Sequence, residues 1–244
     1  MELTLPSNLE NLIKEAIKHF WITRNRQSIN QAQSGRSDQG ARSAVTGGKQ
    51  MDGFSNLFRH LMILNGIQEN EIFTDTNLEL PGFYRPTKKW DIVVVRDHNL
   101  IATLELKSQV GPSFGNNFNN RTEEALGSSI DIWKAYSEGA INASYRPWLG
   151  YLMLLEDCNE SRSNVRVAEP HFNVFSEFRN SSYAKRYELF CRKLMRENNY
   201  TSTCFLMSSK NDNANGGYTQ IANDLTINLL IRSLLGHIIS ITSN

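Results

Sequence analysis

Apolar side chains near the start of the chain recur every three or four positions, as they do along one side of a helix. The run comprises Leu9, Leu12, Ile13, Ala16, Ile17 and Phe20. Ser7 lies just before this run, and Glu10 follows Ser7 by three residues, the spacing of a capping box. We therefore expect an amphipathic first helix. Residues 24–50 lose this periodicity and are rich in Gln, Ser, Gly, Arg and Asn, which predicts a long loop.

A second helical pattern begins at about Asp52 and stops at Asn65-Gly66, a pair that favours left-handed backbone. The apolar residues that this helix would bury are Phe54, Leu57, Phe58 and Leu61. Short strand-like pieces follow at residues 71–73, 77–80, 90–96 and 100–106. Their succession, interrupted by turns, predicts a β-meander.

Two longer patterns complete the predicted core. Residues 122–140 have the spacing of a helix, and residues 147–155 are nearly all apolar, as in a strand that is covered on both faces. Helix, meander, helix and buried strand in this order predict an α/β fold with a mixed β-sheet flanked by helices. A helix near 183–198, a strand near 203–208 and a helix from about 223 are expected at the periphery. The working interpretation is one domain, residues 1–244.

Composition excludes several classes of protein. A formal charge of +1 means that any surface for a polyanion is a local patch. Three cysteines without a paired spacing argue against a disulfide framework or a cysteine zinc site, and the five histidines show no metal-ligand spacing. The first residues do not resemble a signal peptide, and no stretch has the apolar length of a membrane span. We expect a cytoplasmic protein with no membrane partner.

The predicted hairpin of residues 90–106 brings charged groups together. If Arg96 pairs with Leu100 across a three-residue turn, the antiparallel register sets Asp91 opposite Glu105. Strand alternation then sends Lys107 to the same face as Glu105. A slip of one residue would invert the faces and separate the three groups.

This trio suits the hydrolysis of a phosphodiester. Carboxylate oxygens of Asp91 and Glu105 can hold Mg²⁺, which lowers the pKa of a bound water. Lys107 can orient the water, help to deprotonate it, or offset charge that grows on the phosphate. The alternative is an ordinary solvent-exposed polar face, which a bare D…ExK pattern does not exclude.

The surrounding sequence distinguishes these alternatives. Its informative segments are AVTGGKQMDGF at residues 44–54, PGFYRPTKKWD at 81–91 and ELKSQVGPSFGNNFNNRTEE at 105–124. These segments resemble the XhoI family of type II restriction endonucleases. Trp90 stands where the common nuclease pattern has a proline, a departure that leaves the metal-binding acid unchanged.

The resemblance implies several properties. It implies a restriction-endonuclease-like PD-(D/E)XK fold with a catalytic core at about residues 52–156, Mg²⁺ dependence and a homodimer. It also implies cleavage of double-stranded DNA at the palindrome CTCGAG, after the first C, to leave 5′ overhangs. A cognate methyltransferase would act on the same site without stable association.

Residues 111–121 are expected to form a loop directly after the catalytic lysine. Its Gly, Pro and Asn residues favour irregular backbone, and Asn and Arg side chains match adenine and guanine edges. The candidate DNA contacts in this loop are Asn116, Asn117, Asn119, Asn120 and Arg121. An alternative role for Asn120, paired with Glu123, is the cap of the following helix.

Further candidates are weaker. Asp52 is a possible additional acid, because related nucleases often supply a carboxylate from the helix before the meander, but it also suits a helix start. The basic residues expected as phosphate contacts are Lys49, Arg85, Lys88 and Lys89, although surface lysines are usually only solvated. Two other functions stay open: a related nuclease of different or extended specificity, and a non-catalytic DNA-binding relative.

Overall fold

A mixed five-stranded sheet forms the centre of the computed structural model, which describes residues 2–33, 49–212 and 214–242. The strand order is β1 (Ile72–Phe73), β4 (Ile92–Arg96), β5 (Asn99–Gln109), β6 (Trp148–Glu156) and β7 (Ser202–Ser208). The pairs β1–β4 and β4–β5 are antiparallel, whereas β5–β6 and β6–β7 are parallel. The predicted mixed sheet is confirmed, and β6 is buried along nearly all its length as its apolar sequence indicated.

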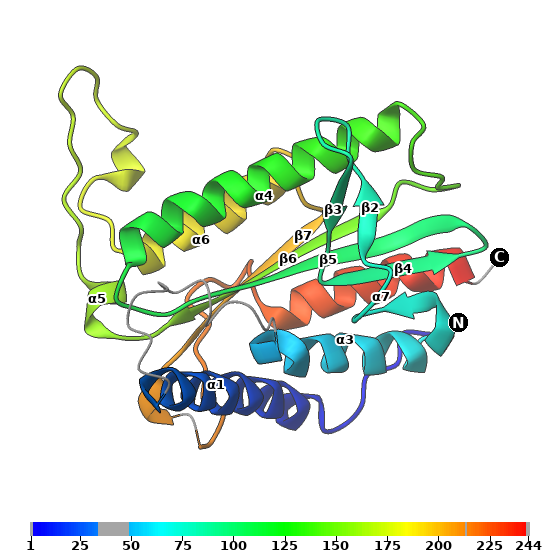
Figure 1. Ribbon diagram of the computed structural model, residues 1–244, viewed down its shortest axis with the longest axis horizontal. Helices are drawn as coiled ribbons and strands as arrows, with labels where there is room; N and C mark the ends of the chain where they lie inside the picture. The colour runs from blue at the N-terminus through cyan, green and yellow to red at the C-terminus, as the bar shows by residue number, and fades with distance from the viewer. Residues whose placement is uncertain (1, 34–48, 213, 243–244) are drawn as a thin grey trace.

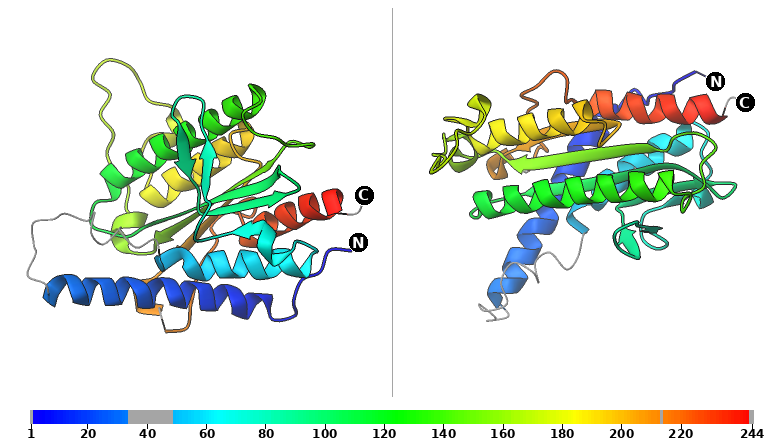
Figure 2. Two further views of the ribbon diagram at one scale, coloured as in Figure 1. Left: turned by 45° about the vertical axis from the view of Figure 1, so that its right-hand side comes forward. Right: turned by 90° about the horizontal axis from the view of Figure 1, so that it is seen from above.

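Helices cover both faces of this sheet (Figures 1 and 2). One face is covered by α1 (Leu9–Gln33), α3 (Asp52–Leu64) and α7 (Ile227–Thr242). The other is covered by α4 (Phe114–Ser137) and α6 (Tyr183–Arg196). The short helix α5 (Asn159–Arg162) follows β6. Each face has its own apolar core, so the α/β fold class is confirmed. None of the helices in the described ranges is long and apolar enough to cross a membrane.

Helix α1 is longer than its sequence pattern predicted. It continues to Gln33, so the prediction of a loop at residues 24–50 is wrong for 24–33, and residues 34–48 lie outside the described residues. Residues 24–33 contain no glycine or proline, and their Arg, Gln and Ala side chains tolerate a helix even without apolar periodicity. The Trp21 indole N–H donates to Ser208 Oγ at 2.9 Å, which joins α1 to the end of β7.

Helix α3 follows the prediction closely. A single 3₁₀ turn, η1 (Lys49–Met51), leads into it, and it ends at Leu64. Gly66 then takes a φ of 96°, the left-handed conformation that glycine adopts without steric cost. The elements expected near 183–198, 203–208 and 223 onwards are also present, as α6, β7 and α7.

The meander differs from the prediction. Strand β1 pairs directly with β4, while β2 (Glu79–Pro81) and β3 (Thr87–Lys89) pair with each other in a separate two-stranded sheet. This small hairpin stands beside α4 (Figure 1). Strand β3 was not predicted, because three polar residues carry no apolar alternation.

Helix α4 begins eight residues before the predicted start at 122. Phe114 stacks on Tyr183 with ring centroids 5.7 Å apart, and Phe118 meets the edge of Tyr187 at 5.0 Å. This packing against α6 outweighs the weak helix preference of the asparagine run. The loop expected at residues 111–121 is therefore wrong from Phe114 onwards, and Asn120 lies inside the helix and does not cap it.

Candidate active site

The β4–β5 hairpin carries the predicted catalytic residues, and its turn differs from the prediction. Arg96 pairs with Asn99, so the turn has two residues and not three. Both of them, Asp97 and His98, have positive φ (48° and 61°), as in the two-residue turns that match the twist of a hairpin. The expected pairing of Arg96 with Leu100 is wrong.

A β-bulge nevertheless restores the predicted register farther along. The register shifts between Val94 and Val95, which makes Ile101 an extra residue of β5. Beyond the bulge Ile92 pairs with Leu104, the pairing that the sequence predicted. Extending this register by one position sets the residue that precedes Ile92 across from Glu105.

The residue that precedes Ile92 is Asp91, which lies directly before the start of β4. Its N–H donates to the Leu104 carbonyl at 3.3 Å, and its Oδ2 accepts the Leu106 N–H at 2.8 Å. Burial raises the pKa of Asp91 above its usual value, although the charge of Lys107 opposes this. The carboxyl group therefore lies in a poorly hydrated position where added positive charge would stabilise its ionised form.

Glu105 is the centre of the cluster. Its side chain is 1% exposed, and its Oε1 lies 3.0 Å from Lys88 Nζ and 3.1 Å from Lys107 Nζ. Its Oε2 accepts the Tyr200 hydroxyl at 2.6 Å. Burial acts to raise the pKa of Glu105, but the two ammonium groups and the tyrosine outweigh it and lower the pKa to about 2. Glu105 is thus a buried carboxylate that stays ionised.

The two lysines differ in their surroundings. Burial acts to lower the pKa of Lys107, but Glu105 and Asp91 raise it above its usual value, so this ammonium stays charged. Burial lowers the pKa of Lys88 despite the opposing charge of Glu105. The structure therefore brings Asp91, Glu105 and Lys107 together, as the register argument expected, and adds Lys88 to them.

Two members of this cluster were missed or given a lesser role in the sequence analysis. Tyr200 follows α6 and is 95 positions from Glu105, and nothing in its local sequence pointed to a carboxylate partner. Lys88 was expected only as a phosphate contact, because its strand was not recognised. The signal available for Lys88 was its place within the segment that resembles the nuclease family.

Comparisons with known proteins identify the family. The family model described as restriction endonuclease XhoI matches residues 30–220. The chain belongs to the XhoI family of restriction endonucleases. The type II restriction enzyme BstVI of Geobacillus stearothermophilus is 55% identical over 215 residues, which cover 86% of this chain and 96% of the relative. The type II restriction enzyme XhoI of Xanthomonas vasicola is 45% identical over 188 residues, covering 76% and 75%. No solved structure matches the chain.

Members of the XhoI family are site-specific deoxyribonucleases, and this chain is therefore an enzyme that acts on DNA. The family also suggests a divalent metal. Within the described part of the chain, no three His, Cys, Asp or Glu side chains gather around one point. Mg²⁺, however, is commonly held by one or two carboxylates together with water and substrate phosphates. The carboxylates of Asp91 and Glu105 fit that mode, since they are neighbouring oxygen donors on one side of the hairpin and Glu105 stays ionised.

Three of the asparagines lie on a different side of α4 from Arg121, whereas Asn117 lies one turn before Arg121 on the same side. Asn116, Asn119 and Asn120 are exposed, at the spacing of one helix face, and Asn117 is half-buried beside them. Arg121 points inward: its Nη1 lies 2.5 Å from Glu124 Oε2, and its Nε is buried without a hydrogen-bond partner among the described residues. Its charge also acts on Lys107, so Arg121 lies toward the Glu105 cluster.

The other predicted site residues lie outside the cluster. Asp52 is exposed at the start of α3, where the charges acting on it come from His19, Asp75 and Lys49 and not from the catalytic residues. Arg85 Nε donates to Asp131 Oδ2 at 2.7 Å. Lys49 and Lys89 are exposed. Of the four basic residues predicted as phosphate contacts, Lys88 is buried against Glu105 and Arg85 is paired with Asp131. Lys49 and Lys89 lie at the surface.

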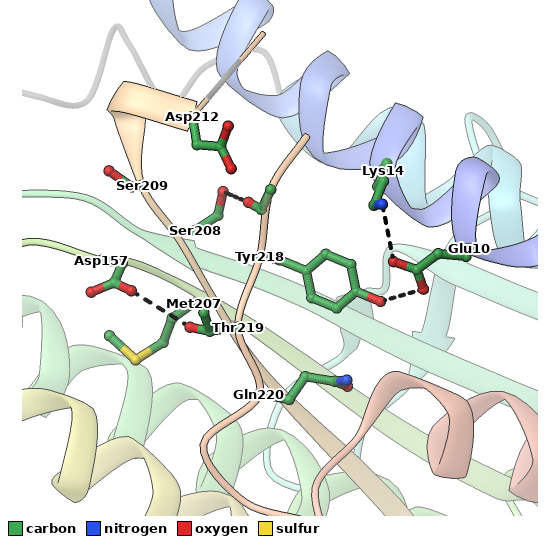
Figure 3. A pocket seen from close by; sticks show the side chains of 11 residues that line it. Glu10, Lys14, Asp157, Met207, Ser208, Ser209, Asp212, Tyr218, Thr219 and Gln220 are labelled. Carbon is green, nitrogen blue, oxygen red and sulfur yellow. Dashed lines mark hydrogen bonds and ion pairs between the residues drawn. The ribbon is translucent and has the colours of Figure 1, made fainter. Parts of the chain in front are cut away.

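A polar pocket of about 500 Å³ lies away from these residues, where β6 and β7 end beside α1 (Figure 3). Glu10 from α1 projects toward it, accepting the Tyr218 hydroxyl at 2.8 Å and pairing with Lys14 at 3.7 Å. Its lining contains none of the catalytic trio. The Glu105 cluster is the stronger candidate for the chemistry, because burial and opposite charges meet there on one carboxylate.

Proposed function

We propose that this enzyme hydrolyses double-stranded DNA at the palindrome CTCGAG, between the first C and T, with Mg²⁺ as cofactor. The observation that carries the reaction type is the buried Glu105 carboxylate, 3.1 Å from Lys107 Nζ and beside Asp91. The sequence and stagger are supported by the resemblance of residues 44–54, 81–91 and 105–124 to the XhoI family. The chain as a whole is proposed to be one nuclease domain.

Each residue of the trio has a distinct role in this proposal. Asp91 and Glu105 would hold Mg²⁺, which supplies an acidified water and a counter-charge for the phosphate. Tyr200 fixes Glu105 by donating to Oε2, which leaves Oε1 turned toward the lysines. Lys107, whose pKa is raised, carries a positive charge that offsets the charge growing on the scissile phosphate.

DNA is bound on the side of the molecule that carries α4. The exposed Asn116, Asn119 and Asn120, with Asn117, are proposed to contact base edges or phosphates. Lys49, Arg85 and Lys89 are proposed as phosphate contacts. A homodimer would place one such surface on each half of the palindrome. A cognate methyltransferase would protect the same sequence without stable association.

Digestion of a plasmid of known sequence with Mg²⁺, followed by sequencing of the ends, tests target and stagger together. We expect cuts at CTCGAG with 5′ overhangs, and no cuts in excess EDTA. Ca²⁺ should support binding with little cleavage, because its looser coordination activates water poorly. Cuts at another sequence would indicate a different specificity, and specific binding without cuts would indicate a non-catalytic relative.

Arg121 is proposed to contact a phosphate close to Lys107, because its inward Nε is buried and without a partner among the described residues. Arg121→Ala should then weaken binding of all sequences about equally and reduce the salt dependence of binding. Competition binding at two salt concentrations measures both quantities. A loss of roughly 1 to 3 kcal/mol of discrimination at one symmetric pair of positions would instead show that Arg121 reads a base.

A further inference from the structure

Lys88 is held in the catalytic cluster from several directions. Its Nζ lies 3.0 Å from Glu105 Oε1, 3.2 Å from the Lys89 carbonyl oxygen and 4.0 Å from the centre of the Trp90 ring. Its side chain is 12% exposed, although it comes from a three-residue strand outside the central sheet. Lys89, the next residue, is exposed. The two lysines therefore lie in opposite environments on one strand.

The hairpin that carries Lys88 is fastened at both of its ends. At the tip, Asp131 of α4 accepts the N–H groups of Phe83 and Tyr84 at 2.7 and 2.8 Å. At the base, the Trp90 N–H donates to the Leu78 carbonyl at 2.9 Å, and the Trp90 side chain is buried. The position of Lys88 beside Glu105 thus follows from the construction of the hairpin and not from the chance orientation of a surface side chain.

Charge in the cluster is balanced when the cluster contains only protein groups. Two carboxyl groups, those of Asp91 and Glu105, and two amino groups, those of Lys88 and Lys107, share the site, so their formal charges cancel. A divalent ion on the same oxygen of Glu105 would stand within a few ångströms of two ammonium groups, and at such distances repulsion in a buried site is strong. A DNA phosphate adds negative charge and offers one ammonium group a new partner.

We propose that Lys88 is a positioning residue which occupies Glu105 Oε1 in the free enzyme, opposes metal binding there, and moves to a DNA phosphate when substrate binds. This inference rests on the proposed function, in which Asp91 and Glu105 are the metal ligands. It makes metal binding depend on DNA. The free enzyme would hold its metal weakly, and the complete catalytic site would form only on the substrate.

Calorimetric titration of the full-length protein with Mn²⁺ in the absence of DNA tests this role. Lys88→Met removes the charge and keeps an unbranched apolar stem over Trp90. We expect it to bind Mn²⁺ at least about tenfold more tightly than the wild type. Lys89→Met, which removes one charge from the same strand on its exposed side, should leave Mn²⁺ affinity unchanged. Lys88→Arg, which keeps the charge and serves if the methionine variant fails to fold, should also bind weakly.

DNA provides the second readout. Here the titrated metal is Ca²⁺, which should leave cognate DNA uncleaved. Adding this DNA should raise the affinity for Ca²⁺ in the wild type much more than in Lys88→Met, because the variant has no ammonium group to move from Glu105 to a phosphate. Equal Mn²⁺ affinity in Lys88→Met and Lys89→Met would overturn the inference. If Glu105→Gln abolishes Mn²⁺ binding in that case, Glu105 remains supported as a metal ligand although the inference about Lys88 is wrong. If Lys88→Met combined with Glu105→Gln still binds Mn²⁺ tightly, both the inference and Glu105 as a metal ligand are wrong.

Discussion

The two faces of the central sheet use burial for opposite purposes. Along β5, Leu104 and Leu106 turn toward α1, α3 and α7 and join an apolar core, whereas Glu105 and Lys107 turn toward α4 and α6. Both leucines and Glu105 are almost completely removed from solvent. The first face gains stability from removing apolar surface from water. The second face also has an apolar core, but around β5 it holds buried charges in place of apolar side chains, and we call it the polar face.

The difference shows how a buried carboxylate is tolerated. A charge removed from water is costly unless it is paired and hydrogen-bonded. Glu105 has partners on both oxygens: Lys107 from its own strand, Lys88 from β3, and Tyr200 from the segment between α6 and β7. The polar face is therefore assembled from distant segments, while the apolar face depends mainly on shape and periodicity.

The largest effect is expected on the polar face. Lys107→Ala should lower the rate of cleavage by roughly 10³-fold, because it removes the charge assigned to the phosphate, while specific DNA binding in Ca²⁺ remains measurable. Single-turnover cleavage and binding assays separate the two quantities. Turnover near that of the wild type would return Lys107 to the role of a solvated polar residue.

Its neighbour on the apolar face should respond in the reverse manner. Leu106→Ala is expected to lower the free energy of unfolding by about 3 kcal/mol, because it leaves a cavity in the core. The cleavage rate per folded molecule should change little, since only the Leu106 backbone N–H contacts Asp91. Urea denaturation and cleavage below the unfolding transition provide the measurements. A large loss of rate without a loss of stability would contradict the division between the faces.

Tyr200→Phe tests whether the tyrosine positions Glu105. Losing a hydrogen bond to a charged group is worth about 1.5 to 3 kcal/mol, so both stability and cleavage should fall, with the rate lower by about tenfold. The affinity for DNA should be unchanged, because Tyr200 is buried. A fall in stability with no change in kcat would make Tyr200 a structural residue only.

The last effect is confined to acid conditions and is a dependence of stability on pH. The pKa of Glu105 is about 2 in the folded protein, against an ordinary value of 4.5. Its contribution to stability is therefore present above pH 4.5 and is lost as the pH falls toward 2. Glu105→Gln should show a shallower loss of stability across this window in chemical denaturation. An identical pH dependence in both proteins would show that Glu105 is not held as an ionised pair.

The apolar face was largely predictable from sequence, and the polar face only in part. Helices α3 and α7 on the apolar face follow local periodicity, which a sequence displays directly, as do strands β6 and β7 and, on the polar face, helix α6. The start of α4 was missed, because it depends on Phe114 and Phe118 packing against a helix that comes much later in the chain. The length of α1 was missed because a helix can continue on intrinsic preference alone.

The site shows the same limit. Asp91, Glu105 and Lys107 could be grouped from strand alternation, since they belong to one hairpin. Tyr200 could not, because its contact with Glu105 exists only after β6, α6 and β7 have been arranged. Arg121 was expected at the end of a loop, but it lies inside α4. A loop gives no fixed direction to a side chain, so the inward direction of Arg121 could not be predicted.

The extra residue at Ile101 gives the hairpin a weakness that amino-acid substitution does not reveal. With a two-residue turn and no bulge, Asp91 would fall across from Leu104 and point into the apolar core. No change of side chain at Ile101 alters this parity, but the loss of one residue from this stretch of β5 does. The number of residues in the hairpin therefore decides which side Asp91 faces. Related enzymes that remain active should tolerate replacement of apolar residues there far better than a deletion or insertion of one residue.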